Sequence, residues 1–346
     1  MPSMQDVARL ARVSPMTVSR VLNNSGPVKE ETRQRVQEAI GRLNYLPNQL
    51  ARSMGSRSGA RILALIMPDI VNPFYTSVAR GVEDTARKNG YTLIICNHDD
   101  DADKELEYFR TLLSLKVDGC LLIPSGDKAR KTMRLLTEHN CPLILIDRHP
   151  SAYDGDYFAG DSFNASADLV KLFVSGGHQR IALINGPTRI STARDRFFGY
   201  KFALEQNGIP FDPNLVYTGE RFDTKIAVAA LDKFLALSDQ PTAVLAANNF
   251  IAVGFIRAAR ARGLDVPTDF ALSCFDKIEP MDLVKPTITM AIQPAYNFGT
   301  IATQLLLEKL TGVPIETPRR IILRSEIVVG ELTKGFVNRL LEPVRQ

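Results

Sequence analysis

The chain has 346 residues, 45% of them hydrophobic, and a formal net charge of +4 at pH 7. This length is too great for one small domain and predicts two or three domains with a buried core. No apolar run approaches the roughly 20 residues that a helix needs to span a bilayer. Residues 1–6 are polar and unlike a signal peptide, so we expect a cytoplasmic protein with no membrane partner.

The cysteines and histidines of the chain give no sign of a metal site. The four cysteines, Cys96, Cys120, Cys141 and Cys274, are scattered and lie in or just before apolar, strand-like runs. We interpret them as small buried hydrophobic side chains rather than as metal ligands or disulfide partners. The four histidines have no metal-ligand spacing. No metal or other cofactor is therefore expected.

The segment DVARLARVSPMTVSRVLN, residues 6–23, predicts two short helices joined by a tight turn. Apolar residues recur at helical spacing in its first half. Ser14 and Pro15 are favoured at the N-cap and the first position of a second helix. Val18, Val21 and Leu22 would share the inward face of that helix. The outward residues would be Pro15, Met16, Thr17, Ser19, Arg20 and Asn23.

The outward face of this second helix suits the major groove of double-stranded DNA. Arg20 can pair bidentately with guanine, whereas hydroxyl and amide side chains suit phosphate contacts, which position a protein without reading sequence. A third helix is expected over residues 31–43. Residues 1–60 hold nine Lys and Arg against four Asp and Glu, and the remainder holds 33 against 34. The positive excess that phosphates require therefore lies in this segment, although a three-helix unit with a solvated basic face is the alternative.

The strings DVARLARVS, TVSRVLN, ETRQRVQEAI and NYLPNQLAR resemble the DNA-binding headpiece of the lactose-repressor (LacI/GalR) family, and the resemblance covers essentially the whole chain. It implies a homodimer that binds a palindromic operator. It also implies a hinge helix over residues 47–55 that forms on DNA, with Met54 in place of the family's wedging Leu. The expected DNA contacts are Ser3, Ser14, Pro15, Met16, Thr17, Ser19, Arg20, Asn23, Thr32, Tyr45, Asn48, Ala51 and Met54.

From residue 61 onward, strand-like runs alternate with helical stretches. The runs are ILALIMP, YTLIICN, DGCLLIP, PLILID, RIALING, TAVLAAN and FALSCFD, and helices are expected over residues 74–89, 102–115, 129–138, 193–207, 225–237 and 252–261. Such βαβ series predict an α/β fold with parallel sheets. Two lobes of this kind resemble the periplasmic sugar-binding proteins, as the family's sensor does.

The expected domains are a helix-turn-helix headpiece (residues 1–46), a hinge helix and linker (47–60) and a two-lobed effector-binding and dimerisation domain (61–346). Lobe one would hold about residues 61–161 and 294–324, and lobe two about residues 162–293 and 325–340. The resemblance places the crossings between the lobes near Asp161, Gln293 and Arg324.

Polar residues follow several of the predicted strands. Open parallel sheets bind ligands beyond the carboxyl ends of their strands, so these residues predict a cleft for a small polar molecule. The expected effector contacts, some of them implied by the family resemblance, are Phe74, Ser125, Asp147, Arg148, Thr192, Arg196, Phe222, Asn248 and Asp276. Structural roles remain open: Asp69 and Asn249 could be turn formers or caps, Phe74 could pack between lobes, and Arg196 could form a buried ion pair.

Lys277 stands where the family commonly has an acidic or amide residue. A cation there favours a sugar acid or sugar phosphate as the effector, with a neutral mono- or disaccharide next and a purine third. An enzyme is not expected, because the chain lacks GxGxxG, GxxxxGK[ST] and GxSxG motifs in the required contexts. The alternative function is a DNA-binding protein without a ligand. The C-terminal tail is too short for a stable coiled coil, which favours a dimer over a tetramer.

Overall fold

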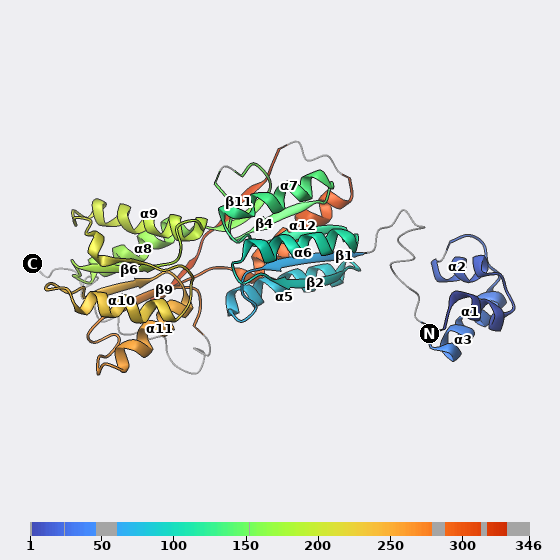
Figure 1. The fold of residues 1–346 in the computed structure, drawn as a ribbon, viewed down its shortest axis with the longest axis horizontal. Coiled ribbons are helices and arrows are strands. Elements are labelled where there is room, and N and C mark those ends of the chain that lie inside the picture. The colour runs from blue at the N-terminus through green and yellow to red at the C-terminus, as the bar shows by residue number, and fades with distance from the viewer. Residues whose placement is uncertain are drawn as a thin grey trace, which may run out of the picture. The chain divides into compact units, whose positions relative to one another are not determined.

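The computed structural model describes residues 2–23, 25–45, 61–151, 153–278, 288–312 and 317–330. The chain separates into two compact units, residues 1–60 and residues 61–346. We call the described part of the first unit the headpiece and the second unit the sensor. Figure 1 shows the elements of each.

The headpiece consists of three helices, α1 (Met4–Ala11), α2 (Pro15–Asn23) and α3 (Glu30–Leu43). Helix α1 begins two residues earlier than expected because Ser3 and Asp6 form a capping box. The Ser3 hydroxyl accepts from the Asp6 N–H at 3.3 Å, and the Asp6 carboxylate accepts from the Ser3 N–H at 2.9 Å. The core that joins the helices is small and apolar: Val7, Ala8, Ala11, Val18, Val21, Val36, Ala39 and Tyr45.

The sensor contains two six-stranded sheets, each at the centre of one lobe. The first has the order β11-β5-β4-β3-β1-β2, and its strands are parallel. They are β1 (Ile62–Met67), β2 (Thr92–Asn97), β3 (Gly119–Leu122), β4 (Leu143–Ile146), β5 (Tyr157–Gly160) and β11 (Arg320–Leu323).

The second sheet has the order β12-β10-β9-β8-β6-β7, which repeats the arrangement of the first. Only β12 runs antiparallel to its neighbour within the described strands. The strands are β6 (Ile181–Asn185), β7 (Val216–Thr218), β8 (Ala243–Ala246), β9 (Ala271–Phe275), β10 (Thr289–Ile292) and β12 (Glu326–Val328).

Helices cover both faces of each sheet. In lobe one, α5 (Pro73–Lys88) and α12 (Ala295–Leu310) share one apolar cluster, and α6 (Ala102–Ser114) and α7 (Arg130–Glu138) share the other. In lobe two the pairs are α8 (Ser162–Ser175) with α9 (Ser191–Gln206), and α10 (Lys225–Leu235) with α11 (Asn249–Arg260). Short 3-10 turns lie at Asp127–Ala129 and Pro213–Leu215. Burial on both faces explains why the strands are continuous apolar runs.

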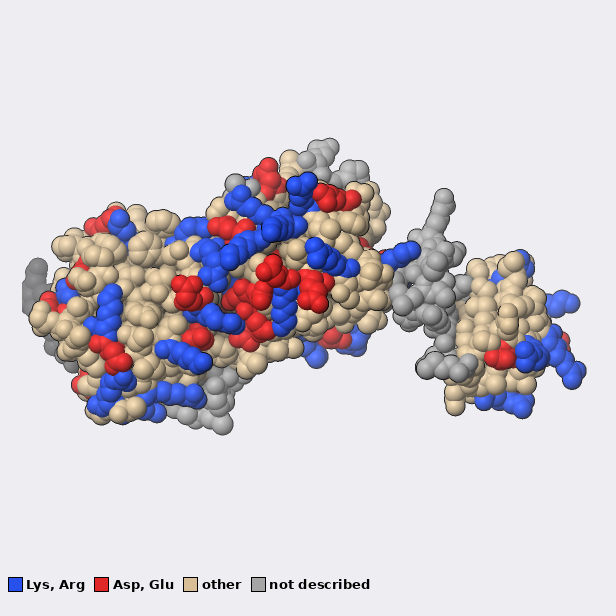
Figure 2. All heavy atoms as spheres, viewed as in Figure 1, with Lys and Arg blue, Asp and Glu red and all other residues tan. Residues whose placement is uncertain are grey.

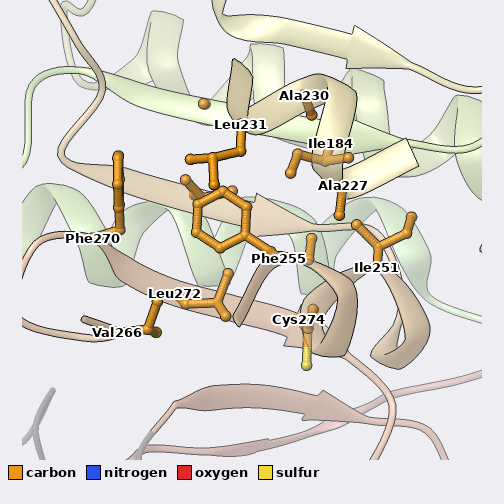
Figure 3. Packing of buried hydrophobic residues seen from close by; sticks show 14 of the residues in the cluster. Ile184, Ala227, Ala230, Leu231, Ile251, Phe255, Val266, Phe270, Leu272 and Cys274 are labelled. Atoms are coloured by element: carbon orange, nitrogen blue, oxygen red, sulfur yellow. The ribbon is translucent and has the colours of Figure 1, made fainter. Parts of the chain in front are cut away.

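The core beneath α10 and α11 shows how the layers are packed. Figure 3 places the ring of Phe255, from α11, among Leu231, Ile251 and Leu272. Phe255 is fully buried and meets Phe270 edge-on, with ring centroids 5.5 Å apart. Such close packing fixes the helices against the sheet and thereby fixes the strand ends where polar residues gather.

The chain passes between the two sheets three times. The passages fall between β5 and α8, between β10 and α12, and between β11 and β12. Each lobe is therefore assembled from segments far apart in sequence. Three connecting segments at the lobe boundary allow a hinge motion without breaking either core.

The helices α5 and α12 approach each other backbone to backbone at two glycines. A Cβ atom at Gly299 would lie 2.1 Å from the carbonyl oxygen of Val78, and one at Gly81 would lie 2.2 Å from that of Tyr296. No side chain other than hydrogen fits at either position. This contact joins the last of the described helices to the first described helix of the sensor.

We predict that Gly299→Ala lowers the free energy of unfolding of the sensor by about 1–3 kcal/mol, the usual range for overpacking. Helix propensity alone predicts the opposite sign, a gain of about 1 kcal/mol, so the sign separates the two effects. Urea unfolding is the measurement. The control is Gln304→Ala on the exposed face of α12, which should change stability by less than about 0.5 kcal/mol.

Candidate functional site

A cavity of about 280 Å³ lies between the two lobes, at the carboxyl ends of the strands. Eight of the nine sensor residues expected from the sequence line it: Phe74, Asp147, Arg148, Thr192, Arg196, Phe222, Asn248 and Asp276. The ninth, Ser125, does not. Its N–H donates to the buried carboxylate of Glu105 at 2.8 Å, and it lines a neighbouring groove instead.

Asp147 and Asp276 occupy equivalent positions in the two lobes. Asp147 follows β4 and Asp276 follows β9, and both have left-handed backbones, with φ of 64° and 68°. Each still donates its N–H to the adjacent strand, Asp147 to Phe158 at 2.6 Å and Asp276 to Ala291 at 2.9 Å. The left-handed turn thus lets each carboxylate leave its strand while the ladder continues.

Both carboxylates are buried, at 3% and 6% exposure, and burial is the main cause that raises the pKa of each. The pKa of Asp276 rises to about 6, although Arg196 and a hydrogen bond from Gln293 oppose the increase. The Oδ1 atom of Asp147 has no hydrogen-bond partner among the described residues. A buried acceptor without a partner is costly, so it is a position where a ligand hydroxyl would be stabilised.

Arg148 is held rigidly at the wall of the cavity. It is 3% exposed and donates to the carboxylate of Asp100 at 2.5 Å and to the hydroxyl of Tyr75 at 2.8 Å. Asp100 and Tyr75 also line the cavity, but sequence analysis did not identify them. The guanidinium lies 5.8 Å from the ring centroid of Phe222, which comes from the other lobe. Its charge is therefore largely compensated within the protein.

Arg196 has a different environment. Its guanidinium lies 4.0 Å from the centroid of the Phe275 ring and donates to the carbonyl of Ala247 at 2.5 Å. Its Nε has no partner, and no carboxylate within the described residues forms an ion pair with it. The alternative role as a buried ion pair is therefore absent from the described chain. Arg196 remains a buried cation at the cavity with donors available.

A pair of buried amides joins the two lobes beside the cavity. Asn72, the N-cap of α5, donates to Asn249 at 3.2 Å, and Asn249 donates back to Asn72 at 3.3 Å. A second contact links the N–H of His149 to the hydroxyl of Ser191 at 3.1 Å. The lobes therefore meet through polar groups, which can exchange partners with water when the lobes separate.

The surroundings of Asp69 and Lys277 differ from those of a simple ligand contact. The side chain of Asp69 accepts from the N–H of Val71 at 2.9 Å and so forms a turn, although Asp69 also lines the cavity. Lys277 does not line the main cavity but an adjoining hollow, which shares Phe74, Asp276 and Gln293 with it. The charge on which an anionic ligand was expected is therefore not in the main cavity.

A polar groove continues from the cavity and shares Asp100 and Arg221 with it. It is lined by acidic residues of the β2–α6 connection and by basic residues of both lobes, including Lys128 and Arg189. Figure 2 shows acidic and basic side chains next to each other in the middle of the sensor. The mixed charges give the groove no strong preference for anions or cations.

In the headpiece, the side chains expected to touch DNA are mostly on the surface. Met16 is 65% exposed, and Pro15 and Arg20 are exposed beside it on α2, whereas Val18 and Val21 face the core. Figure 2 shows more Lys and Arg than Asp and Glu on the visible face of the headpiece.

Several expected DNA contacts have local partners or lie in the core. The Ser14 hydroxyl accepts from the Thr17 N–H at 3.2 Å and lies 2.9 Å from the Thr17 hydroxyl, so this pair caps α2. Ser3 caps α1, and Thr32 lies half-buried in the first turn of α3. Tyr45, also expected at DNA, instead packs in the core at 9% exposure because it follows α3 back over the other helices.

Part of the expected DNA-binding surface is outside the described structure. Asn48, Ala51 and Met54 lie outside the described residues, and of Asn23 only the backbone is described. Among the helices that are described, none is long and apolar enough to cross a membrane. The same part of the chain has no cluster of three or more side chains suited to a metal ion.

Comparison with known proteins supports both halves of this arrangement. Residues 3–48 match the model for bacterial regulatory proteins of the lacI family, and residues 170–332 match a periplasmic binding protein-like domain. The chain is 34% identical over 327 residues to the catabolite control protein A of Priestia megaterium, covering 92% of this chain and 97% of that protein. It is 34% identical over 341 residues to a ribose operon repressor of Halalkalibacterium halodurans, covering 98% and 99%. A solved complex of the transcriptional regulator CelR with cellobiose aligns with a TM-score of 0.72 at 28% identity, over 96% and 99% of the two chains.

The burial of Asp276 predicts a pH-dependent cost in stability. Because its pKa is about 6 in the folded protein and 3.8 ordinarily, stability should fall as pH rises from about 4 to about 6 and then level off. We predict that Asp276→Asn, which keeps the acceptor for Gln293, raises the free energy of unfolding of the ligand-free sensor at pH 7 by on the order of 3 kcal/mol.

Urea unfolding at pH 4 to 7.5 measures this effect. The stability gap between Asp276→Asn and the natural chain should be small at pH 4 and open with rising pH. Asp168→Asn, which changes a carboxylate at 53% exposure in the same lobe, should open no such gap. A gap that stays constant over this range would show that the stabilisation does not come from removing the buried charge.

Proposed function

Because the chain belongs to the lacI family of bacterial regulatory proteins, it is a DNA-binding transcriptional regulator, and we propose that it is a repressor controlled by a neutral polyhydroxylated ligand. The headpieces of a dimer would bind the two halves of a palindromic operator. The ligand would bind in the cavity between the lobes of the sensor. Because the protein would bind operator DNA, we place it in the cytoplasm. We propose no enzymatic activity for it.

The observation that supports the ligand is the pair of buried carboxylates. Asp147 and Asp276 reach the cavity from opposite lobes, and Asp147 has an unpartnered acceptor oxygen. Vicinal hydroxyls of a sugar can donate to such carboxylates, while Arg196 can donate to ring or hydroxyl oxygens. A carboxylate or phosphate on the ligand would lie close to these two acids and be repelled by them. Arg148 would not offset this repulsion, because it is already paired with Asp100.

This arrangement favours a neutral sugar over the sugar acid or sugar phosphate expected first from the sequence. The expectation of an anionic ligand depends on Lys277, which lines the adjoining hollow and not the main cavity. Two of the similar proteins are named for a ribose operon and for a cellobiose complex, and both names refer to neutral sugars. A transcriptional repressor named PurR is also among the relatives at 32% identity, and the purine expected third from the sequence is the second candidate.

The regulatory step would follow from the position of the cavity. A ligand that contacts both lobes stabilises the arrangement in which Asn72 and Asn249 are hydrogen-bonded. It changes DNA binding only if it binds one arrangement more tightly than the other. Residues 47–55, expected to form the hinge helix with Met54 as its wedge, lie outside the described residues, so that role remains a prediction.

The first experiment tests the DNA-reading residue. Arg20 is the exposed arginine of α2, and a bidentate contact to guanine is worth about 1–3 kcal/mol of discrimination. We predict that Arg20→Ala weakens operator binding by this amount per half-site and relaxes the base preference at one position. Operator selection from a randomised library at fixed salt measures both effects.

The matched control for Arg20 is Arg9→Ala. Arg9 is exposed on α1 and paired with Asp6 at 3.5 Å, so its removal should leave the selected sequence unchanged. If Arg20→Ala selects the same operator with the affinity of the natural chain, the assignment of Arg20 to a base contact is wrong.

The second experiment tests the ligand class by calorimetric titration with matched neutral and acidic sugars. We predict binding of a neutral sugar, a loss of at least tenfold in affinity for Asp276→Asn, and no change for Lys277→Gln. The loss follows because a hydrogen bond to a charged group contributes about 1.5–3 kcal/mol. Exclusive binding of acidic sugars, lost in Lys277→Gln, would contradict the proposal.

A further inference from the structure

Two of the four cysteines lie side by side in lobe one. The Sγ atoms of Cys120 and Cys141 are 3.7 Å apart, and both thiols are free. Cys120 is fully buried in β3, whereas Cys141 is half-buried in the turn between α7 and β4. From the sequence, the four cysteines are interpreted as separate small hydrophobic side chains, and this pairing arises only from the alignment of two neighbouring strands.

The backbone holds the two thiols in this position. The N–H of Cys120 donates to the carbonyl of Pro142 at 2.9 Å, in the ladder between β3 and β4. The N–H of Cys141 donates to the carbonyl of Leu136 at 3.0 Å, at the end of α7. A disulfide needs the sulfur atoms at about 2.05 Å. The two sulfur atoms must approach each other by about 1.6 Å more, and Cys141 lies in a turn rather than within a strand.

We propose that Cys120 and Cys141 are an oxidative modification site that closes to an intramolecular disulfide when the protein meets hydrogen peroxide. The thiolate of Cys141 attacks one peroxide oxygen, the O–O bond breaks, and the departing hydroxide leaves as water after taking a proton. The sulfur of Cys120 then attacks the sulfenic acid of Cys141. The S–O bond breaks, and hydroxide leaves as water with the proton from Cys120. Two thiols are oxidised, and the peroxide is reduced to two waters.

The environment assigns the order of these steps. The neighbouring thiol of Cys120 lowers the pKa of Cys141, and the same pairing together with burial raises the pKa of Cys120. The thiolate is the reactive form, so the half-buried Cys141 is the attacking group. Cys120 lies behind it as the resolving thiol, protected from solvent until Cys141 has reacted.

The position of the cross-link is close to the start of the sensor. Asp118, two residues before Cys120, accepts from the N–H of Ile62 at 2.9 Å through its carboxylate and donates its own N–H to the carbonyl of Ile62 at 2.8 Å. Ile62 is the first residue of β1. A disulfide between Cys120 and Cys141 would therefore link the turn before β4 to β3. The residue Asp118, just before β3, is the one that holds the start of β1.

The test is a titration of the full-length protein with hydrogen peroxide, at doses that oxidise half of an equal concentration of free glutathione. We expect the count of thiols in denaturant to fall from four to two and the mass to fall by two hydrogen atoms. Peptide mapping should show Cys120 linked to Cys141, and dithiothreitol should restore all four thiols. The protein should remain a single chain on a non-reducing gel.

Two variants make this result decisive. Cys141→Ser should form no internal disulfide, and because this residue is half-buried the substitution should not affect folding. Cys96→Ser removes another half-buried thiol that packs in the same apolar cluster as Cys120, and it should still lose two thiols. The proposal is overturned if the natural chain keeps four thiols at these doses, if Cys141 is linked elsewhere, or if it is oxidised further without a link to Cys120.

Discussion

The burial of two carboxylates between the lobes is the constraint on which the sensor depends. Asp147 and Asp276 directly follow β4 and β9, and the Oδ1 atom of Asp147 has no hydrogen-bond partner among the described residues. Burying an acid raises its pKa and lowers the stability of the folded protein near neutral pH. A binding site is a place where such a cost is tolerated. The cavity can therefore be understood as a set of polar groups prepared for a ligand rather than as part of the core.

The two lobes divide this task symmetrically. Their sheets share one strand order, so the same structural position delivers one acid from each side. The contacts between the lobes include the pair Asn72 and Asn249 and the hydrogen bond from His149 to Ser191, and the Arg148 guanidinium also lies near the Phe222 ring. Since separated amides can hydrogen-bond to water, both a closed and an open arrangement of the lobes can satisfy these groups. A ligand that donates to both acids can then decide between them.

The fold class was predicted correctly, because apolar runs followed by amphipathic helices carry a strong periodic signal. The elements that were missed are mainly short strands, such as β5 and β7, whose three or four residues show no period of their own. Helices α8 and α12 were missed as well, and the position of α12 is set by the glycine contact with α5. The cavity residues were found where they follow a predicted strand or where the family resemblance implies a contact. Asp100 was not, since a run of aspartates is typical of a solvated loop and only tertiary structure brings it to Arg148.

The headpiece follows a simpler logic than the sensor. Its core holds only eight buried apolar side chains, and the outward face of α2 carries one arginine and otherwise small or neutral groups. One bidentate contact of about 1–3 kcal/mol per half-site is far less than the roughly 4–10 kcal/mol that separates specific from non-specific binding in typical regulators. The remaining discrimination must come from two headpieces acting together and from the shape and deformability of the DNA. A change in the spacing of the two headpieces can therefore release the operator without a change in any base contact. This is the form of control that a two-lobed sensor can exert.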